Sequence, residues 1–147
     1  MRLAVEPSLR PADYPFRHRI RVRFAETDAM GIVHHSRYIP YFEEARVEYL
    51  RAIDRPYTLW REKGLDAAVL EVFVQYRQAL RFDDEIDVHV LLAAITRTTF
   101  QMAYLVTRDA EPVSTAVTVH GAVTADGRPT RLPDWLVEMG SSAPPPG

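Results

Sequence analysis

Acidic and histidine side chains gather in the ten residues 26–35, ETDAMGIVHH, which interrupt an alternation of apolar and polar residues. Asp28 carries the group best suited to chemistry here, because a positioned carboxylate can attack a carbonyl carbon or take a proton from water. Its surroundings also suit a structural role, since Thr-Asp ahead of a glycine is typical of a turn closed by the aspartate side chain. From the residue types alone, a turn former is favoured over a catalyst.

Two adjacent histidines, His34 and His35, end the same stretch, and together with Glu26 they raise the question of a metal site. Neighbouring side chains point apart in an extended segment, and no His-x3-His spacing follows on a helix to complete a set of ligands. We therefore predict no metal site. The His35 ring has two interpretations that stay open, acid–base participation at a substrate carbonyl or a structural hydrogen bond at a helix start.

The residues that follow have the spacing of an amphipathic helix that begins just past the histidines. Apolar side chains recur at positions 38, 42, 45, 49 and 53, and charged side chains fill many of the positions between them. Ser36 is a candidate N-cap, and Pro40 falls in the first turn, where a missing backbone N–H is tolerated. Glu43 and Arg46 stand three residues apart, so we expect them to pair along the helix surface and Arg46 to be structural.

Alternation with a period of two predicts five strands. The first, residues 18–24, alternates with arginines whose face suits either ion pairs in solvent or phosphate binding. The other four are residues 68–76, 86–92, 100–106 and 113–123. Short links between the later strands predict an antiparallel meander with the helix packed against it, so the fold class is α+β. Apolar Val69 and Phe73 on the second face of their strand predict a subunit interface there, or a cover formed by the connector 54–64.

Length and composition limit the classes of protein that this chain can be. At 147 residues it fits one domain, and its net charge of -2 lacks the basic excess typical of nucleic-acid binding. The absence of cysteine excludes disulfides, thiolate metal clusters and cysteine nucleophiles. No apolar stretch is typical of a signal peptide or long enough to span a bilayer, which predicts a cytoplasmic protein. Residues 1–15 and the Pro-rich tail 138–147 are expected to be flexible, on either side of a single domain at 16–137.

Motifs spread over residues 19–136 resemble those of the hotdog-fold acyl-CoA thioesterases of the 4-hydroxybenzoyl-CoA thioesterase family. The first motif consists of Thr27, Asp28, Ala29, Gly31, Ile32, Val33, His35 and Tyr38, followed by FEEAR at 42–46. The second consists of Val74, Tyr76, Ala79, Arg81, Asp83, Asp84 and Val88, with Arg131, Leu132 and Pro133 near the end. The resemblance implies a hotdog fold, in which a five-stranded antiparallel sheet wraps around one long central helix.

In this family the aspartate of the first motif is the catalytic carboxylate, so the resemblance implies that Asp28 is catalytic in the hydrolysis of an acyl-CoA to free acid and CoA. Asp28 would act as nucleophile or as general base toward water, and the sequence does not choose between them. The start of the helix offers unpaired N–H groups and the positive end of a dipole, so we assign the N–H of His35 as donor to the oxyanion. Gly31 lets the backbone approach the ligand closely. The other residues expected to bind substrate on this side are Ile32, Val33 and Tyr38.

Coenzyme A carries phosphates, so cations are expected at the mouth of the site, and Arg77, Arg81 and Arg97 are candidates near strand ends. The resemblance also implies a pocket between two subunits, and therefore a homodimer or homotetramer, with no cofactor beyond the CoA of the substrate. Met30 and His34 depart from the pattern of the family. These two departures bear on the acyl group rather than on the type of reaction.

Two other functions stay open from the sequence. A hotdog hydratase or dehydratase would use a histidine and an acid on the same class of thioester. A non-catalytic acyl-CoA-binding protein would share the pocket without turnover. If Asp28 were buried away from the pocket, Glu43 or Glu44 on the central helix would be the next candidate acid.

Overall fold

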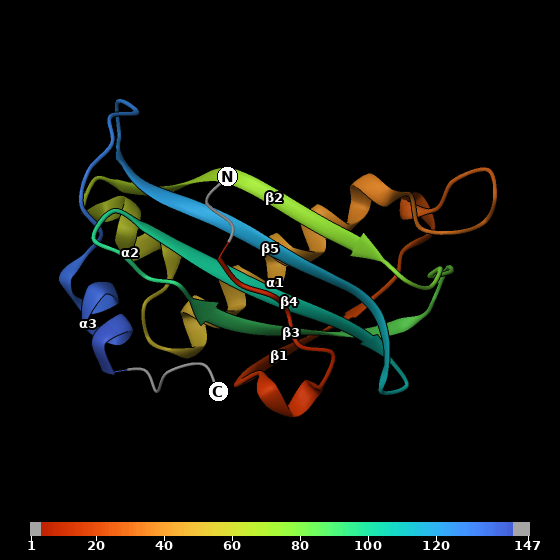
Figure 1. Ribbon diagram of the computed structural model, residues 1–147. Helices are drawn as coiled ribbons and strands as arrows, with labels where there is room; N and C mark the ends of the chain where they lie inside the picture. The colour runs from red at the N-terminus through yellow and green to blue at the C-terminus, as the bar shows by residue number, and fades with distance from the viewer. Residues whose placement is uncertain (1–3, 143–147) are drawn as a thin grey trace.

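The strands predicted from the period of two form one antiparallel sheet in the computed structural model, which describes residues 4–142 (Figure 1). In chain order they are β1 (Phe16–Arg21), β2 (Leu65–Tyr76), β3 (Glu85–Ala93), β4 (Thr99–Arg108) and β5 (Glu111–Thr124). They lie in the order β1-β3-β4-β5-β2, so β1 and β2 are the edges. The helical elements are α1 (Tyr38–Ala52), α2 (Tyr57–Glu62) and α3 (Asp134–Ser142), with 3-10 turns η1 (Pro11–Asp13), η2 (Phe24–Glu26) and η3 (His35–Arg37). The predicted α+β class, with one long helix against five antiparallel strands, is confirmed.

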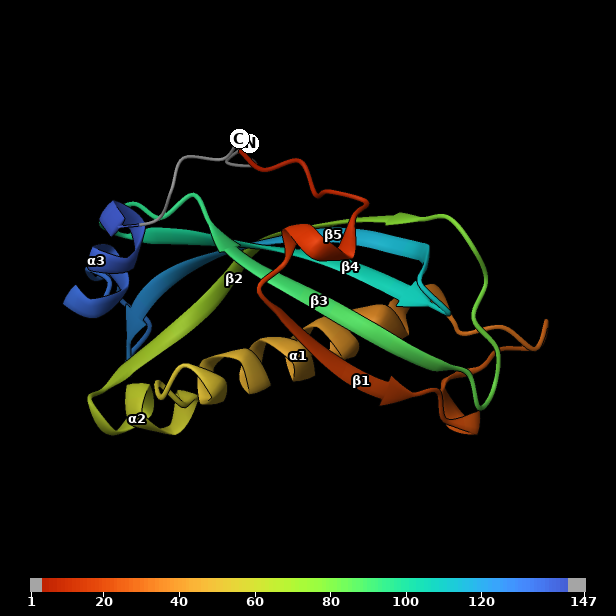
Figure 2. The same ribbon diagram turned by 90° about the horizontal axis from the view of Figure 1, so that it is seen from below.

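The long helix α1 lies across one face of the sheet and buries its apolar stripe there (Figure 2). Phe42 and Ala45 are fully buried, and Tyr49 is nearly so. The Phe42 ring meets that of Tyr104 on β4, with the ring centroids 4.8 Å apart. The stripe read from the sequence is therefore the contact between helix and sheet.

The start of α1 differs from the prediction at its cap. Ser36 lies inside η3 rather than at the N-cap of α1, because a 3-10 turn precedes the helix, as is frequent at helix ends. The ring of His34 caps this turn instead, since its Nδ1 accepts from the Ser36 N–H at 3.2 Å. Pro40 falls in the first turn of α1, as predicted. Helical structure therefore begins at His35, three residues before α1 itself.

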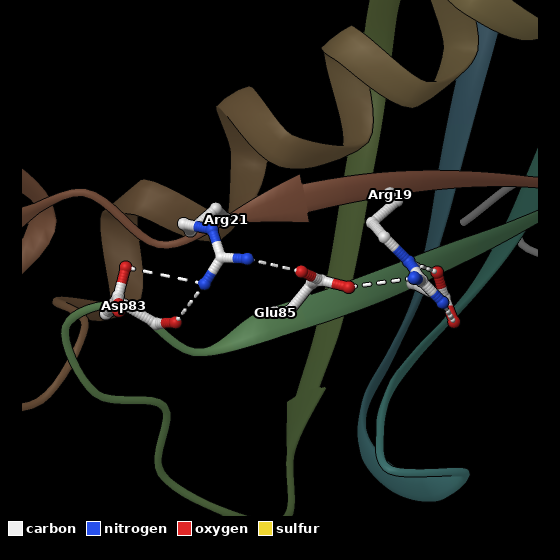
Figure 3. A network of polar contacts seen from close by, with 5 residues as sticks. Arg19, Arg21, Asp83 and Glu85 are labelled. Atoms are coloured by element: carbon white, nitrogen blue, oxygen red, sulfur yellow. Dashed lines mark hydrogen bonds and ion pairs between the residues drawn. The ribbon is translucent and has the colours of Figure 1, made fainter.

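The β1 edge is covered with charge (Figure 3). Arg19 donates to Asp87 and lies 2.8 Å from a carboxylate oxygen of Glu85, and Arg21 bonds both Glu85 and Asp83. Exposed pairs of this kind contribute little stability each, yet a row of charges keeps another strand from pairing with this edge. The arginine face of this strand, for which ion pairs in solvent and phosphate binding were both open, forms ion pairs in the structure.

The first strand ends earlier than predicted. β1 stops at Arg21, because reciprocal hydrogen bonds between Arg23 and Glu26 form a capping box that opens η2. Phe24, expected to continue the buried face of the strand, is 73% exposed and lies edge-on to the ring of Phe82. The chain therefore turns out of the sheet just before the stretch that carries Asp28.

The β2 edge is apolar and open. Val69 is 50% exposed and Phe73 is 44% exposed. The connector helix α2 meets β2 at the start of the strand, where the Tyr57 hydroxyl donates to Asp66 at 2.9 Å. Because α2 leaves Val69 and Phe73 open, the expectation that the connector covers this face is wrong. A subunit interface there stays a prediction.

Residues 4–15 lie on the face of the sheet opposite α1 (Figure 2). Tyr14 is buried against Ala103 and Leu105, and its hydroxyl donates to the Ser8 carbonyl at 2.8 Å. Part of the segment expected to be flexible therefore packs on the sheet, because the Tyr14 side chain finds apolar partners on β4.

The C-terminal segment is also more ordered than expected. α3 runs to Ser142, and Leu136 near its start is 1% exposed in the core. Residues 138–142, which were expected to begin a flexible tail, continue this helix. Residues 1–3 and 143–147, the rest of the two predicted flexible segments, lie outside the described residues.

Candidate active site

Asp28 lies in a tight turn between η2 and η3, and its own side chain closes that turn. Oδ1 accepts from the N–H groups of Met30, at 2.9 Å, and Ile32, at 3.4 Å. The Asp28 N–H donates to the Ile32 carbonyl at 2.8 Å, and the Gly31 N–H donates to the Asp28 carbonyl at 2.9 Å. Gly31 has φ +78°, a left-handed conformation that favours glycine. Asp28 is therefore a turn former, as its immediate sequence suggests.

The second carboxylate oxygen of Asp28 takes no part in closing the turn. Oδ2 has no hydrogen-bond partner among residues 4–142, and the side chain is partly exposed. A carboxylate offers two oxygens, each of which can accept independently. Because the turn uses one of them only, the structural and the catalytic roles of Asp28 are compatible.

His35 begins η3, the turn that leads into α1, and its backbone is held from β2. The Tyr76 hydroxyl donates to the His35 carbonyl at 2.8 Å. Within the described part of the chain, the His35 N–H has no acceptor, as the first N–H groups of a helical segment generally lack one. The ring of His35 lies against that of His34, with centroids 4.1 Å apart, and takes part in no hydrogen bond among the described residues. The free N–H, rather than the ring, is thus fixed in place as a donor.

The connection between β2 and β3 forms the other side of the turn (Figure 2). The Val33 N–H donates to the Leu80 carbonyl at 2.8 Å, and Ile32 forms an isolated bridge with Arg81. A Cβ placed on Gly31 would lie 4.0 Å from Nη1 of Arg81, so the guanidinium lies beside the turn. The structure therefore brings Ile32, Gly31 and the exposed Arg81 to the side of Asp28.

Of three other residues that were expected to bind substrate, two lie in the core and one lies at the end of β2. Val33 is 4% exposed and Tyr38 is 2% exposed, and the Tyr38 ring lies edge-on to Tyr76 at 4.9 Å. Because both side chains complete the core, they support the loop from within, which differs from the direct contact with substrate that we expected. Arg77 is exposed at the end of β2, where its N–H donates to the Val113 carbonyl at 2.8 Å.

Glu26 has a structural role in this loop that its sequence context does not reveal, since there it stands out only as a possible metal ligand. Its side chain is buried, with 4% exposed. Oε1 accepts from the Arg23 N–H at 2.8 Å and from the Tyr41 hydroxyl at 2.7 Å, while Oε2 accepts from the Arg23 guanidinium at 3.0 Å. Burial acts to raise the pKa of Glu26, but the hydrogen bonds from Arg23 and Tyr41 outweigh it and lower that pKa. Glu26 is therefore held as a carboxylate.

The acids of α1 face other partners. Glu44 lies 2.7 Å from Nε2 of His18 on β1, and Glu43 is exposed. Arg46 donates to the Tyr104 hydroxyl at 3.1 Å, which supports its expected structural role. No ion pair joins Arg46 to Glu43 in the described residues, so the prediction that these two side chains pair on the helix surface is wrong. Since Asp28 is partly exposed, neither glutamate has to replace it as the candidate acid.

Asp28 is not among the lining residues of two hollows in the described part of the chain. One, of about 330 Å³, lies between β1 and α1 and is lined by paired groups such as His18 and Glu44. The other, of about 520 Å³, lies beside Trp135 where the end of α1 meets α3. Within residues 4–142, no group of three or more histidine and acidic side chains is arranged to hold a metal ion, and no helix is long and apolar enough to cross a membrane.

Comparison with known proteins places the chain among thioesterases. The model of the Thioesterase-like superfamily matches residues 22–139. A solved structure of a hypothetical protein from Aquifex aeolicus is 42% identical, with a TM-score of 0.81, and the match covers 84% of this chain and 98% of that one. A thioesterase from Thermus thermophilus, solved with coenzyme A and zinc, is 30% identical with a TM-score of 0.72, over 85% of this chain and 91% of that one. The acyl-CoA thioesterase YbgC of Haemophilus influenzae is 40% identical over 73 residues, which are 49% of this chain and 54% of that relative.

The family match includes the Asp28 turn, the start of α1 and all strands after it. The arrangement of one long helix against a five-stranded antiparallel sheet is shared with the solved relatives over most of their length. The chain therefore belongs to the Thioesterase-like superfamily and is a thioester hydrolase with the hotdog fold.

Proposed function

We propose that this protein hydrolyses acyl-CoA thioesters to the free acid and CoA, with Asp28 as the catalytic carboxylate and the N–H of His35 as the oxyanion donor. One observation carries the proposal: a single short loop holds a carboxylate oxygen and a backbone N–H, both without partners among residues 4–142. The naming of one relative as an acyl-CoA thioesterase and the coenzyme A in the Thermus thermophilus thioesterase support CoA as the carrier. Arg81, beside the turn, is suited to a phosphate of CoA.

The reaction begins when Oδ2 of Asp28 attacks the thioester carbonyl carbon, or takes a proton from a water molecule that attacks it. Either attack places negative charge on the carbonyl oxygen, which the His35 N–H and the positive end of the α1 dipole stabilise. Loss of one such donor typically costs about 3–4 kcal/mol of transition-state stabilisation. The C–S bond then breaks, and the CoA thiolate leaves and takes up a proton. On the nucleophilic route, water hydrolyses the mixed anhydride on Asp28, releases the acid and restores the carboxylate.

The difference between the two sheet edges supports a homodimer along β2. The β1 edge is charged, whereas the β2 edge presents Val69 and Phe73 beside a row of backbone groups that no strand of this chain pairs within the described residues. Two β2 strands can pair in a self-complementary way across a two-fold axis. Tyr76 on the same strand holds the His35 carbonyl, so a partner along β2 would lie next to the candidate site and supply its second wall. A homotetramer would add another interface to this one.

The experiment that tests the proposal is thiol release from a panel of aryl, short-chain and medium-chain acyl-CoAs. We expect CoA thiol to appear in step with free acid for one group of substrates. Loss of the conjugated absorbance of an enoyl-CoA without thiol release would indicate a hydratase and contradict the proposal. Binding of a non-hydrolysable acyl-CoA analogue with no turnover across the panel would contradict it in favour of a binding protein.

A further inference from the structure

Glu26 connects the loop that carries Asp28 to the beginning of α1, and it takes no part in the proposed reaction. The Tyr41 hydroxyl on α1 donates to Oε1 of Glu26 at 2.7 Å, and both side chains are buried. Arg23 occupies the rest of the carboxylate, because its N–H donates to Oε1 and its guanidinium donates to Oε2. Hydrogen bonds to a buried carboxylate are stronger than those between neutral groups, so this contact holds the loop against the helix.

The backbone of Glu26 holds the opposite side of the same loop. Its carbonyl accepts from the His34 N–H at 2.9 Å, and Thr27 forms a bridge with Val33, so the two arms of the loop are joined at their base. Asp28 follows this base on one arm, and His35 precedes α1 on the other. The base therefore lies next to both groups assigned to the chemistry, and Tyr41 sets its place relative to the helix.

From this arrangement we infer that Glu26 and Tyr41 are positioning residues that hold Oδ2 of Asp28 in register with the N–H of His35. The inference rests on the proposed function, because it depends on the roles assigned to those two groups. A displacement of about 1 Å in a reacting geometry lowers turnover about a hundredfold. The contact between Glu26 and Tyr41 thus controls kcat, whereas KM depends mainly on contacts to CoA elsewhere.

Three variants test this positioning role. Glu26→Ala removes the acceptor and Tyr41→Phe removes the donor, while Glu26→Gln keeps an oxygen that accepts from both Tyr41 and the Arg23 N–H. We expect kcat to fall about tenfold to a hundredfold in Glu26→Ala and Tyr41→Phe, with KM within about threefold. Glu26→Gln should keep kcat within about threefold of the wild type, because the bond to Tyr41 survives. The double variant that combines Glu26→Ala with Tyr41→Phe should show no lower kcat than Glu26→Ala alone, since both changes remove the same hydrogen bond.

Tyr57→Phe is the matched control. The Tyr57 hydroxyl also donates to a carboxylate, Oδ1 of Asp66 at 2.9 Å, but this bond joins α2 to β2. We expect Tyr57→Phe to lower stability with kcat unchanged. Hydrogen exchange gives a second measurement, because the amide of His34 bonds the Glu26 carbonyl and should exchange faster in Tyr41→Phe and at the wild-type rate in Tyr57→Phe.

The outcomes separate this inference from the proposed function. Wild-type kcat in Tyr41→Phe, a loss confined to KM, or an equal loss of kcat in Tyr57→Phe would overturn the positioning role. A wild-type protein that hydrolyses none of the acyl-CoA panel would overturn the proposed function instead. In that case the exchange rate of the His34 amide still decides whether Tyr41 holds the loop.

Discussion

The Asp28→Asn substitution separates the structural role of Asp28 from its chemical role. The amide oxygen can still accept from Met30 and Ile32, the bonds of 2.9 Å and 3.4 Å that close the turn. The amide cannot serve as nucleophile or general base, and loss of such a group typically lowers turnover about 10²–10⁴-fold. We therefore expect kcat to fall about a hundredfold or more, while the free energy of unfolding changes by less than about 1 kcal/mol.

Asp28→Ala removes both the turn-forming and the chemical role, so it shows how much stability the hydrogen bonds of the turn contribute. A hydrogen bond of this kind contributes about 0.5–1.5 kcal/mol, and the longer bond to Ile32 is the weaker of the two, so about 1–2 kcal/mol is lost in total. In a domain of this size such a loss lowers Tm by about 2–8 °C. Thiol release should therefore be equally low in Asp28→Asn and Asp28→Ala, whereas thermal unfolding should move clearly only in Asp28→Ala.

An Asp28→Asn protein that keeps about a tenth or more of the wild-type kcat would refute this reasoning, because Asp28 would then be a turn former alone. Equal losses of Tm in the two variants would refute the assignment of Oδ1 to the turn. Asp126→Asn is the control, since Oδ1 of Asp126 accepts from the Thr124 hydroxyl in the turn after β5. We expect that change to leave kcat and KM at wild-type values.

Three further changes test the β2 edge, the cation beside the Asp28 turn and the buried core. Phe73→Lys places a charge on the open β2 edge, and light scattering should then give the mass of a single chain where the wild type gives a dimer or larger assembly. Arg81→Ala removes the cation beside the turn, so KM for acyl-CoA should rise with kcat little changed, and an unchanged KM would argue against a phosphate contact. Burial, with a smaller effect of Arg46, lowers the pKa of His120 from 6.5 to about 3, so between these values the unfolded chain binds a proton that the folded chain does not. The free energy of unfolding should therefore fall by up to about 1.4 kcal/mol per pH unit as the pH drops below 6.5, and urea titrations of His120→Gln should lack this part of the slope.

The periodic elements are predictable from the sequence because their signal is local. The spacing of Phe42, Ala45 and Tyr49 gives the buried side of α1 without knowledge of what covers it. The N-terminal segment carries no such signal, because Tyr14 is a single aromatic residue among prolines. Its burial depends on Ala103 of β4, far along the chain, and a window of sequence contains no information on that contact.

The candidate site divides in the same way between local and distant contacts. The bonds from Oδ1 of Asp28 reach two and four residues ahead, so the sequence itself shows the turn. The bond between Glu26 and Tyr41 spans fifteen residues and forms only when α1 packs on the sheet, which is why an acid in a loop gives no hint of it. The turn alone fixes one oxygen of Asp28, whereas the packing of α1 decides where the N–H of His35 lies relative to the other oxygen. A carboxylate in such a turn can work on a thioester only where a helix start is held beside it, and that condition comes from tertiary structure.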